Sequence, residues 1–163
     1  MLDRTLFVLG RAAAVAAPAG LLIWLMANLR VGNVSLLRHC AAALDPVARV
    51  FGMDGVILMA FLLGMPANEI VIPIAVMAYT ATGSLAEVGT ATLRNILLAN
   101  GWTGTTALCT LLFALMHWPC TTTLLTVRKE TGSAAYTALA ALLPTVCGLL
   151  CCLIVNALSH LLV

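Results

Sequence analysis

Long apolar segments dominate this chain and limit what it can fold into. A membrane-crossing helix takes about 20 mostly apolar residues, and four segments have that length: residues 5–29, 55–79, 102–127 and 134–163. Charged residues make up only 9% of the sequence, against about 25% in soluble domains. A soluble fold would therefore lack the charges that cover a surface. The sequence predicts an all-α bundle of transmembrane helices in a lipid bilayer.

A more polar stretch separates the first two apolar segments. Residues 30–54 contain three arginines and two aspartates. Apolar residues recur there at helical spacing: Leu36, Leu37, Ala41, Leu44, Val47, Ala48 and Phe51. This pattern is typical of an amphipathic helix on the membrane surface or beneath a bundle. Residues 84–100 are also less apolar than their neighbours. They predict a second helix at the interface.

Two of the apolar segments are interrupted near their middle. Gly-Met-Pro-Ala-Asn-Glu, residues 64–69, interrupts the second segment, and His-Trp-Pro-Cys, residues 117–120, interrupts the third. Proline removes a backbone donor and disfavours helical geometry just before it, so Pro66 and Pro119 predict two broken helices. Non-helical backbone at membrane depth is stable only inside protein or beside a cavity. Many transporters build their ion sites from such helices.

The second break offers soft donor atoms for a metal ion. If Pro119 begins the half-helix that follows, Cys120 lies in its first turn, where N–H groups and the helix dipole favour a thiolate. His117 could add an imidazole nitrogen, and Thr121 and Thr122 could line the path with hydroxyls. The alternative is that His117 and Cys120 only pack against their neighbours.

The first break offers oxygen donors. Asn68 and Glu69 are expected in the first turn of the half-helix that follows Pro66, and Glu69 is the only acidic residue within the long apolar segments. A carboxylate in such a place is a cation ligand, a proton carrier or the partner of a buried arginine. The alternative is that both side chains cap the half-helix.

Composition and missing motifs exclude several functions. The net charge is only +2, which argues against a nucleic-acid partner. The single lysine, Lys129, follows no phosphate-binding loop, and neither His-Glu-x-x-His nor Gly-x-Ser-x-Gly occurs, so we expect no enzyme activity. Four of the six cysteines lie in apolar helical runs and are expected to pack there as small hydrophobes: Cys109, Cys147, Cys151 and Cys152.

Short motifs from residue 10 to residue 133 occur in a characteristic order. They are Gly-Arg-Ala (10–12) with Ala-Pro-Ala-Gly (17–20), Leu-Asp-Pro (44–46), Gly-Met-Asp-Gly (52–55), Gly-Met-Pro-Ala-Asn-Glu-Ile (64–70), Leu-Ala-Asn-Gly-Trp (98–102), His-Trp-Pro-Cys (117–120) with Thr-Thr-Leu (122–124), and Lys-Glu-Thr-Gly-Ser (129–133). Together they resemble the C-terminal membrane half of the FeoB family, the bacterial ferrous iron transporter B.

The resemblance implies that residues 1–163 form one transmembrane domain that matches the second of the family's two Gate segments. It implies that transport also needs the family's GTPase domain and first Gate segment, which this sequence does not match. It implies a multi-pass protein of the bacterial inner membrane with Fe²⁺ as transported ion and no permanently bound cofactor. Pro119-Cys120 matches the family's proposed iron path, and Cys120 and Glu69 are expected to face each other. Implied partners are the GTPase-containing N-terminal portion or a companion chain, and a homo-oligomer.

Two other functions fit the same residues. One is a membrane scaffold or assembly subunit, in which the breaks are packing kinks. The other is a Gate-type nucleoside or solute carrier, in which Asn68 and Glu69 would bind an organic substrate. Basic residues favour the cytoplasmic side of a membrane. Arg128 and Lys129 and the arginines of residues 30–54 therefore both favour that side. Whether both regions can lie there depends on whether each broken segment spans the membrane or re-enters it.

Overall fold

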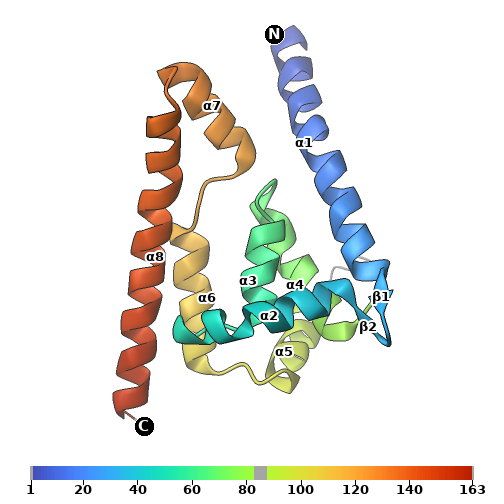
Figure 1. Cartoon of the computed structure of the whole chain (residues 1–163), viewed down its shortest axis with the longest axis vertical. Helices are drawn as coiled ribbons and strands as arrows, with labels where there is room; N and C mark the ends of the chain where they lie inside the picture. Colours follow the sequence, from blue (N-terminus) through green and yellow to red (C-terminus); the bar gives the residue numbers. More distant parts are fainter. Residues whose placement is uncertain (1, 83–87, 163) are drawn as a thin grey trace.

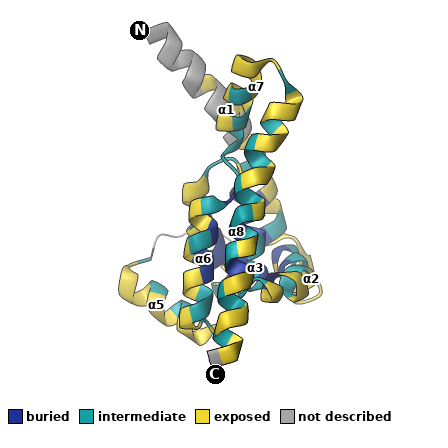
Figure 2. Ribbon diagram, turned by 90° about the vertical axis from the view of Figure 1, so that its left-hand side faces the viewer, coloured by how far each residue is buried: buried dark blue, intermediate teal, exposed yellow. Residues whose placement is uncertain are grey.

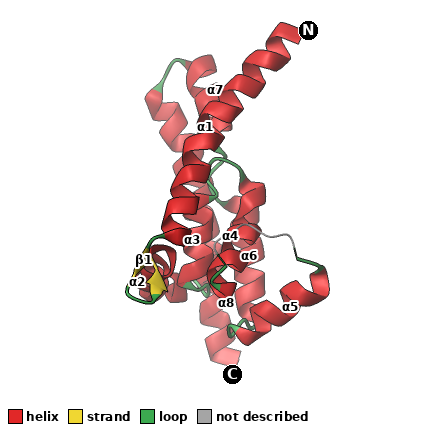
Figure 3. Cartoon of the chain, turned by 90° about the vertical axis from the view of Figure 1, so that its right-hand side faces the viewer, coloured by secondary structure: helices red, strands yellow, loops and turns green. Residues whose placement is uncertain are grey.

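Helices form almost all of the regular structure in the computed structural model, which describes residues 2–82 and 88–162 (Figure 1). In chain order they are α1 (Leu2–Asn28), α2 (Leu36–Val50), α3 (Gly55–Leu63), the 3-10 helix η1 (Asn68–Ile70), α4 (Val71–Thr80), α5 (Thr90–Ala99), α6 (Gly104–Met116), α7 (Thr121–Thr131) and α8 (Ala134–Leu162). Within the described residues, the one sheet is a small antiparallel hairpin of β1 (Arg30–Val31) and β2 (Val34–Ser35), seen in Figure 3. The all-α prediction is confirmed.

Among the described residues, two stretches are long and apolar enough to cross a membrane, and α2 with α3, bent by 108°, would be a third if the pair forms one span. One combines α6 and α7 over Gly104–Thr131, and the other is Ala134–Leu161 of α8, each with 28 residues. A shorter apolar stretch, Ala17–Asn28, lies in α1. α8 packs along α6 and α7, while side chains such as Leu142 and Leu150 remain exposed. This outward apolar surface is what a helix in lipid presents.

The second apolar segment doubles back at its break, an arrangement that the sequence left open beside that of a continuing broken helix. The Tyr79 hydroxyl at the end of α4 donates a hydrogen bond to the carboxylate of Asp54, just before α3. Gly64 at the end of α3 lies against Val71 at the start of α4, where a Cβ on Gly64 would be 2.5 Å from Val71 Cγ2. The predicted interruption is therefore present, but α3 and α4 form an antiparallel helical hairpin whose tip is the break (Figure 1).

A chain of hydrogen bonds fastens the open end of this hairpin. Asp54 caps α3 by accepting from the Ile57 N–H at 2.7 Å, and its second carboxylate oxygen accepts from the Tyr79 hydroxyl. Trp102 Nε1 donates to the same hydroxyl at 2.8 Å. Trp102 leads into α6, so these bonds tie both ends of the hairpin to the helix that carries the second break.

The predicted amphipathic helix is α2, which lies across the foot of the hairpin at 108° to α3. Its buried residues are Leu37, Ala41 and Ala48. The Asp45 carboxylate accepts from the Gly55 N–H at 3.0 Å. A Cβ on Gly55 would lie 2.0 Å from the Ala41 carbonyl oxygen. The first residue of α3 therefore rests directly on the backbone of α2.

The second expected interfacial helix is shorter than predicted. α5 covers Thr90–Ala99, and residues 84–87 of the expected range lie outside the described part of the chain. None of the α5 residues is buried. Figure 2 shows buried residues gathered in the middle of the bundle, at α3 and α6, whereas α5 projects from it with exposed residues.

The hairpin also decides how the basic segments are arranged. The β1–β2 hairpin and α2 lie at one end of the bundle, and the turn between α7 and α8, next to Arg128 and Lys129, lies at the other (Figure 1). Because the second segment returns to the end from which it started, the two basic regions lie at opposite ends of the structure.

We predict that Gly55→Ala destabilises the fold by about 1–3 kcal/mol or more, because the added methyl meets the backbone of α2 and cannot be accommodated by a side-chain rotation. The matched control is Gly104→Ala, at the first residue of α6, where a Cβ meets nothing within 4 Å. Thermal unfolding in detergent, followed by circular dichroism, measures both. Equal melting temperatures for the two variants would contradict the packing described for α2 and α3.

Candidate functional site

The two breaks meet in the middle of the structure. The Thr121 N–H, at the start of α7, donates to the Met65 carbonyl oxygen in the tip of the α3–α4 hairpin at 3.1 Å. The Thr121 hydroxyl donates to the same oxygen at 3.3 Å. The first N–H groups of a helix and the carbonyls that end one lack intrahelical partners. The contact therefore pairs an unsatisfied donor of one broken helix with an acceptor of the other.

Cys120 is the N-cap residue of α7, one position before the helix rather than within its first turn. Pro119 thus belongs to the connecting segment, in which Cys120 has extended backbone angles of φ −59° and ψ 155°. The Cys120 Sγ lies 3.1 Å from the Thr122 hydroxyl and 3.1 Å from the Thr123 hydroxyl. Both hydroxyls can donate to a thiolate, so the half-buried sulfur sits where a negative charge is stabilised.

His117 occupies a buried position at the end of α6. Its ring packs against Phe61, Phe113 and Trp118, with ring centroids 5.0, 5.9 and 5.8 Å away. Nδ1 lies 2.9 Å from the Ala114 carbonyl oxygen, which accepts only from a protonated nitrogen. In the neutral ring the lone pair is then on Nε2. Metal-binding histidines are held by a backbone carbonyl in the same way.

Buried polar atoms without partners cluster at this break. Among the described residues three such side-chain atoms occur, and two of them, His117 Nε2 and Trp118 Nε1, belong to the second break; the third is Thr110 Oγ1 of α6. A buried polar atom without a partner is costly and points to a missing water, ion or ligand. The second break therefore combines a nitrogen lone pair without a partner and a sulfur that contacts two threonine hydroxyls.

Asn68 and Glu69 lie on the other side of the contact, in the 3-10 turn η1 rather than in an α-helical turn. Both are exposed. The N-cap of this turn is Ala67, without a side-chain capping bond. The capping alternative is therefore not what the structure shows, and no hydrogen bond joins either side chain to Cys120 within the described residues.

The donors do not form a closed metal site. Within residues 2–82 and 88–162, no three His, Cys, Asp or Glu side chains are grouped so that they could hold one metal ion. Of the predicted residues, Thr121 makes the contact between the breaks, and Cys120 is hydrogen-bonded to Thr122. His117 packs among the rings of Phe61, Phe113 and Trp118. Asn68 and Glu69 are exposed in the 3-10 turn of the hairpin tip.

Sequence reasoning missed two participants. Thr123 contributes the second hydroxyl at Cys120 Sγ, and the run of three threonines was the signal for it. The Met65 carbonyl receives both bonds from Thr121. No pattern of side chains predicts that a particular backbone carbonyl will accept a hydrogen bond. The role of the Met65 carbonyl depends on where the hairpin tip lies relative to α7.

Residues 9–134 match the sequence profile of the Gate family, described as nucleoside recognition. The chain belongs to the Gate family. The match covers both breaks and the whole α3–α4 hairpin, and Gate domains also occur in FeoB proteins. Searches of curated proteins and of solved structures found no match for the chain. The family match and the apolar helices of the chain together indicate a membrane protein of the nucleoside and solute transporter type.

We predict that a small membrane-permeant thiol reagent modifies Cys120 at least about tenfold faster than Cys109, because reaction at a fully buried thiol requires local opening of the fold. Cys109 is 0% exposed, whereas Cys120 is half-buried at the break. Peptide mass spectrometry of the unmodified chain after timed alkylation gives both rates in one sample. Equal rates would show that the sulfur of Cys120 is not open at the break.

Proposed function

We propose that this chain forms one part of a path by which Fe²⁺ crosses the bacterial inner membrane. The observation that carries the proposal is the Thr121–Met65 contact, which brings two helix breaks together beside a thiol and a free imidazole nitrogen. Discontinuous helices that meet in this way are the usual frame of transporter ion sites. The resemblance to FeoB and the Gate family match support the same conclusion.

The chemistry of the donors suits Fe²⁺ as cargo. Thiolate and imidazole bind divalent transition metals in preference to Mg²⁺ or Ca²⁺. Cys120 Sγ and His117 Nε2 would supply these ligands in turn, and the hydroxyls of Thr122 and Thr123 would line the passage. The exposed Asn68 and Glu69 would offer oxygen donors at the tip of the hairpin. A path needs weak sites so that the ion can leave, and a set of scattered donors provides them.

A partner would complete the path. Non-helical backbone at membrane depth must be covered by protein or border a water-filled cavity, yet Asn68 and Glu69 at the hairpin tip are exposed. We propose that the GTPase-containing N-terminal portion of a FeoB-type transporter, a companion chain or a second copy covers this tip. In this arrangement the chain is a permease part with no catalytic residue and no resident cofactor.

A carrier of nucleosides or of another organic solute is the second candidate. The family is described by nucleoside recognition, and the rings of Phe61, Phe113, His117 and Trp118 form one group beside the break. Aromatic rings stack on bases. Phe113 is 0% exposed and Phe61 2%, so a base would reach them only if α3 and α6 moved apart.

We predict that Fe²⁺ protects Cys120 from alkylation under anaerobic conditions. At a free Fe²⁺ concentration of about ten times the dissociation constant, only about one site in ten remains unoccupied. The alkylation rate of Cys120 should therefore fall by about tenfold. Mg²⁺ at the same concentration should have no effect, because it prefers oxygen ligands. The measurement is the alkylation rate of Cys120 in the purified chain, with Cys147 on α8 as the internal control.

The other outcomes separate the alternatives. Protection by a nucleoside such as uridine, without protection by Fe²⁺, would replace the iron path by the organic solute carrier. Protection by neither, with a folded chain, would leave Cys120 as a packing residue and favour the scaffold.

We also predict that Cys120→Ser removes most of the ⁵⁵Fe²⁺ uptake in a bacterium that lacks its own ferrous transporter and expresses this chain with a GTPase-and-first-Gate portion. Serine keeps the size of the side chain but loses the soft sulfur ligand. Cys147→Ser, in the lipid-facing helix α8, is the matched control and should keep normal uptake. Unchanged uptake in Cys120→Ser, with equal amounts of protein in the membrane, would exclude Cys120 from the path.

A further inference from the structure

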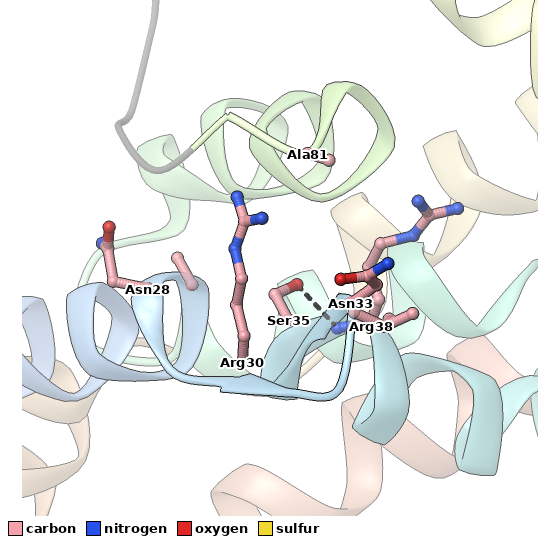
Figure 4. A pocket seen from close by; sticks show the side chains of 8 residues that line it. Asn28, Arg30, Asn33, Ser35, Arg38 and Ala81 are labelled. Carbon is pink, nitrogen blue, oxygen red and sulfur yellow. Dashed lines mark hydrogen bonds between the residues drawn. The ribbon is translucent and has the colours of Figure 1, made fainter.

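A second polar site lies at the end of the molecule that carries the β1–β2 hairpin. A cavity of about 180 Å³ opens between the end of α1, the hairpin, the start of α2 and the end of α4. The side chains labelled around it in Figure 4 are Asn28, Arg30, Asn33, Ser35, Arg38 and Ala81. Neither helix break contributes a residue to this cavity, so it is separate from the proposed iron path.

The charges around the cavity are all positive. Arg30 and Arg38 both line it, and none of the described residues that line it is a carboxylate. Within the described residues neither arginine forms an ion pair, whereas Arg49, farther along α2, is held by Asp45 at 2.6 Å. In Figure 4 the Arg30 side chain extends toward the end of α4 at Ala81, with Asn33, Ser35 and Arg38 on the other side of the space. Two unneutralised guanidinium groups at one cavity attract an anion.

The donors suit a phosphate group in particular. Guanidinium groups bind phosphate oxygens with paired N–H donors, and the amide of Asn33 adds another donor. α2 has no acidic residue in its first turn, and Ser35 already caps it by accepting from the Arg38 N–H at 3.4 Å. The positive end of α2 therefore adds to the field of the two arginines without a competing carboxylate.

The surroundings of the cavity are those of a membrane interface. Exposed apolar side chains flank it: Trp24 is 57% exposed, Leu29 53% and Val31 61%. Tryptophan is enriched at the level of the lipid headgroups. The cavity also lies where an apolar helix, α1, gives way to the amphipathic helix α2. A lipid could place its phosphate between the arginines and its acyl chains along α1.

We propose that this cavity binds the phosphate of an anionic phospholipid, with Arg30 and Arg38 as the charged ligands and Asn33 as a further donor. Basic pockets beside membrane helices recognise anionic headgroups through the same chemistry. A bound lipid would fasten the β1–β2 hairpin and the start of α2 to the end of α4. The free phosphate ion has the same recognition chemistry and serves as a competitor in the test.

The test measures binding of fluorescent phosphatidylglycerol to the full chain in detergent micelles by anisotropy, with fluorescent phosphatidylcholine as the zwitterionic reference. We expect phosphatidylglycerol to bind more tightly than phosphatidylcholine. The double variant Arg30→Gln/Arg38→Gln should weaken phosphatidylglycerol binding by about 30-fold, from two arginines at a lipid surface. Arg49→Gln/Arg94→Gln removes the same charge elsewhere and should retain most of the affinity.

Three results would overturn the proposal. Equal binding of phosphatidylglycerol and phosphatidylcholine by the wild-type chain would show that the cavity does not recognise an anionic headgroup. The charge of Arg30 would then only offset the negative C-terminal end of the α4 dipole. An equal loss of phosphatidylglycerol affinity in both double variants would show that binding depends on the overall charge of the protein and not on Arg30 and Arg38. Displacement of phosphatidylglycerol by an equal concentration of inorganic phosphate would make the cavity a site for the free ion. Circular dichroism of each variant establishes that it is folded, and the comparison of lipids on the wild-type chain needs no variant.

Discussion

The hydrogen bond from the Thr121 N–H to the Met65 carbonyl is the contact on which the arrangement of the candidate site depends. Each of the two breaks leaves backbone groups without helical partners, and in a membrane such groups cost several kcal/mol each when unsatisfied. By pairing a donor from one break with an acceptor from the other, the chain stabilises both. Cys120, its two hydroxyl neighbours and His117 are placed around this contact.

That contact requires the α3–α4 hairpin to be narrow and correctly placed. Gly64 allows α4 to approach the end of α3, and Gly55 allows the start of α3 to rest on α2. Small residues are the usual means by which membrane helices pack closely. Asp54, Tyr79 and Trp102 then connect the open end of the hairpin to α6 by hydrogen bonds. A close glycine contact and a polar contact thus occur together at each end of the hairpin, Gly55 with Asp54 at the open end and Gly64 with the Met65 carbonyl at the tip.

Much of the local structure was predictable because its causes are local. The apolar runs, Pro66 and Pro119 located the helices and both interruptions, and the spacing of Leu37, Ala41 and Ala48 identified α2. The roles of individual side chains were less predictable. Cys120 became an N-cap residue, because α7 begins at Thr121. Asn68 and Glu69 ended in an exposed 3-10 turn, since the chain reverses there instead of continuing as a half-helix.

The sequence by itself determined that this is a helical membrane protein with two polar interruptions and a basic amphipathic segment, because hydropathy and proline geometry act over a few neighbouring residues. Only the tertiary structure decided that the second segment is a hairpin, that the two breaks touch, and that Arg30 and Arg38 share a cavity with the end of α4. These facts join residues tens of positions apart. They depend on close glycine contacts and on backbone acceptors, which leave no periodic pattern in a sequence.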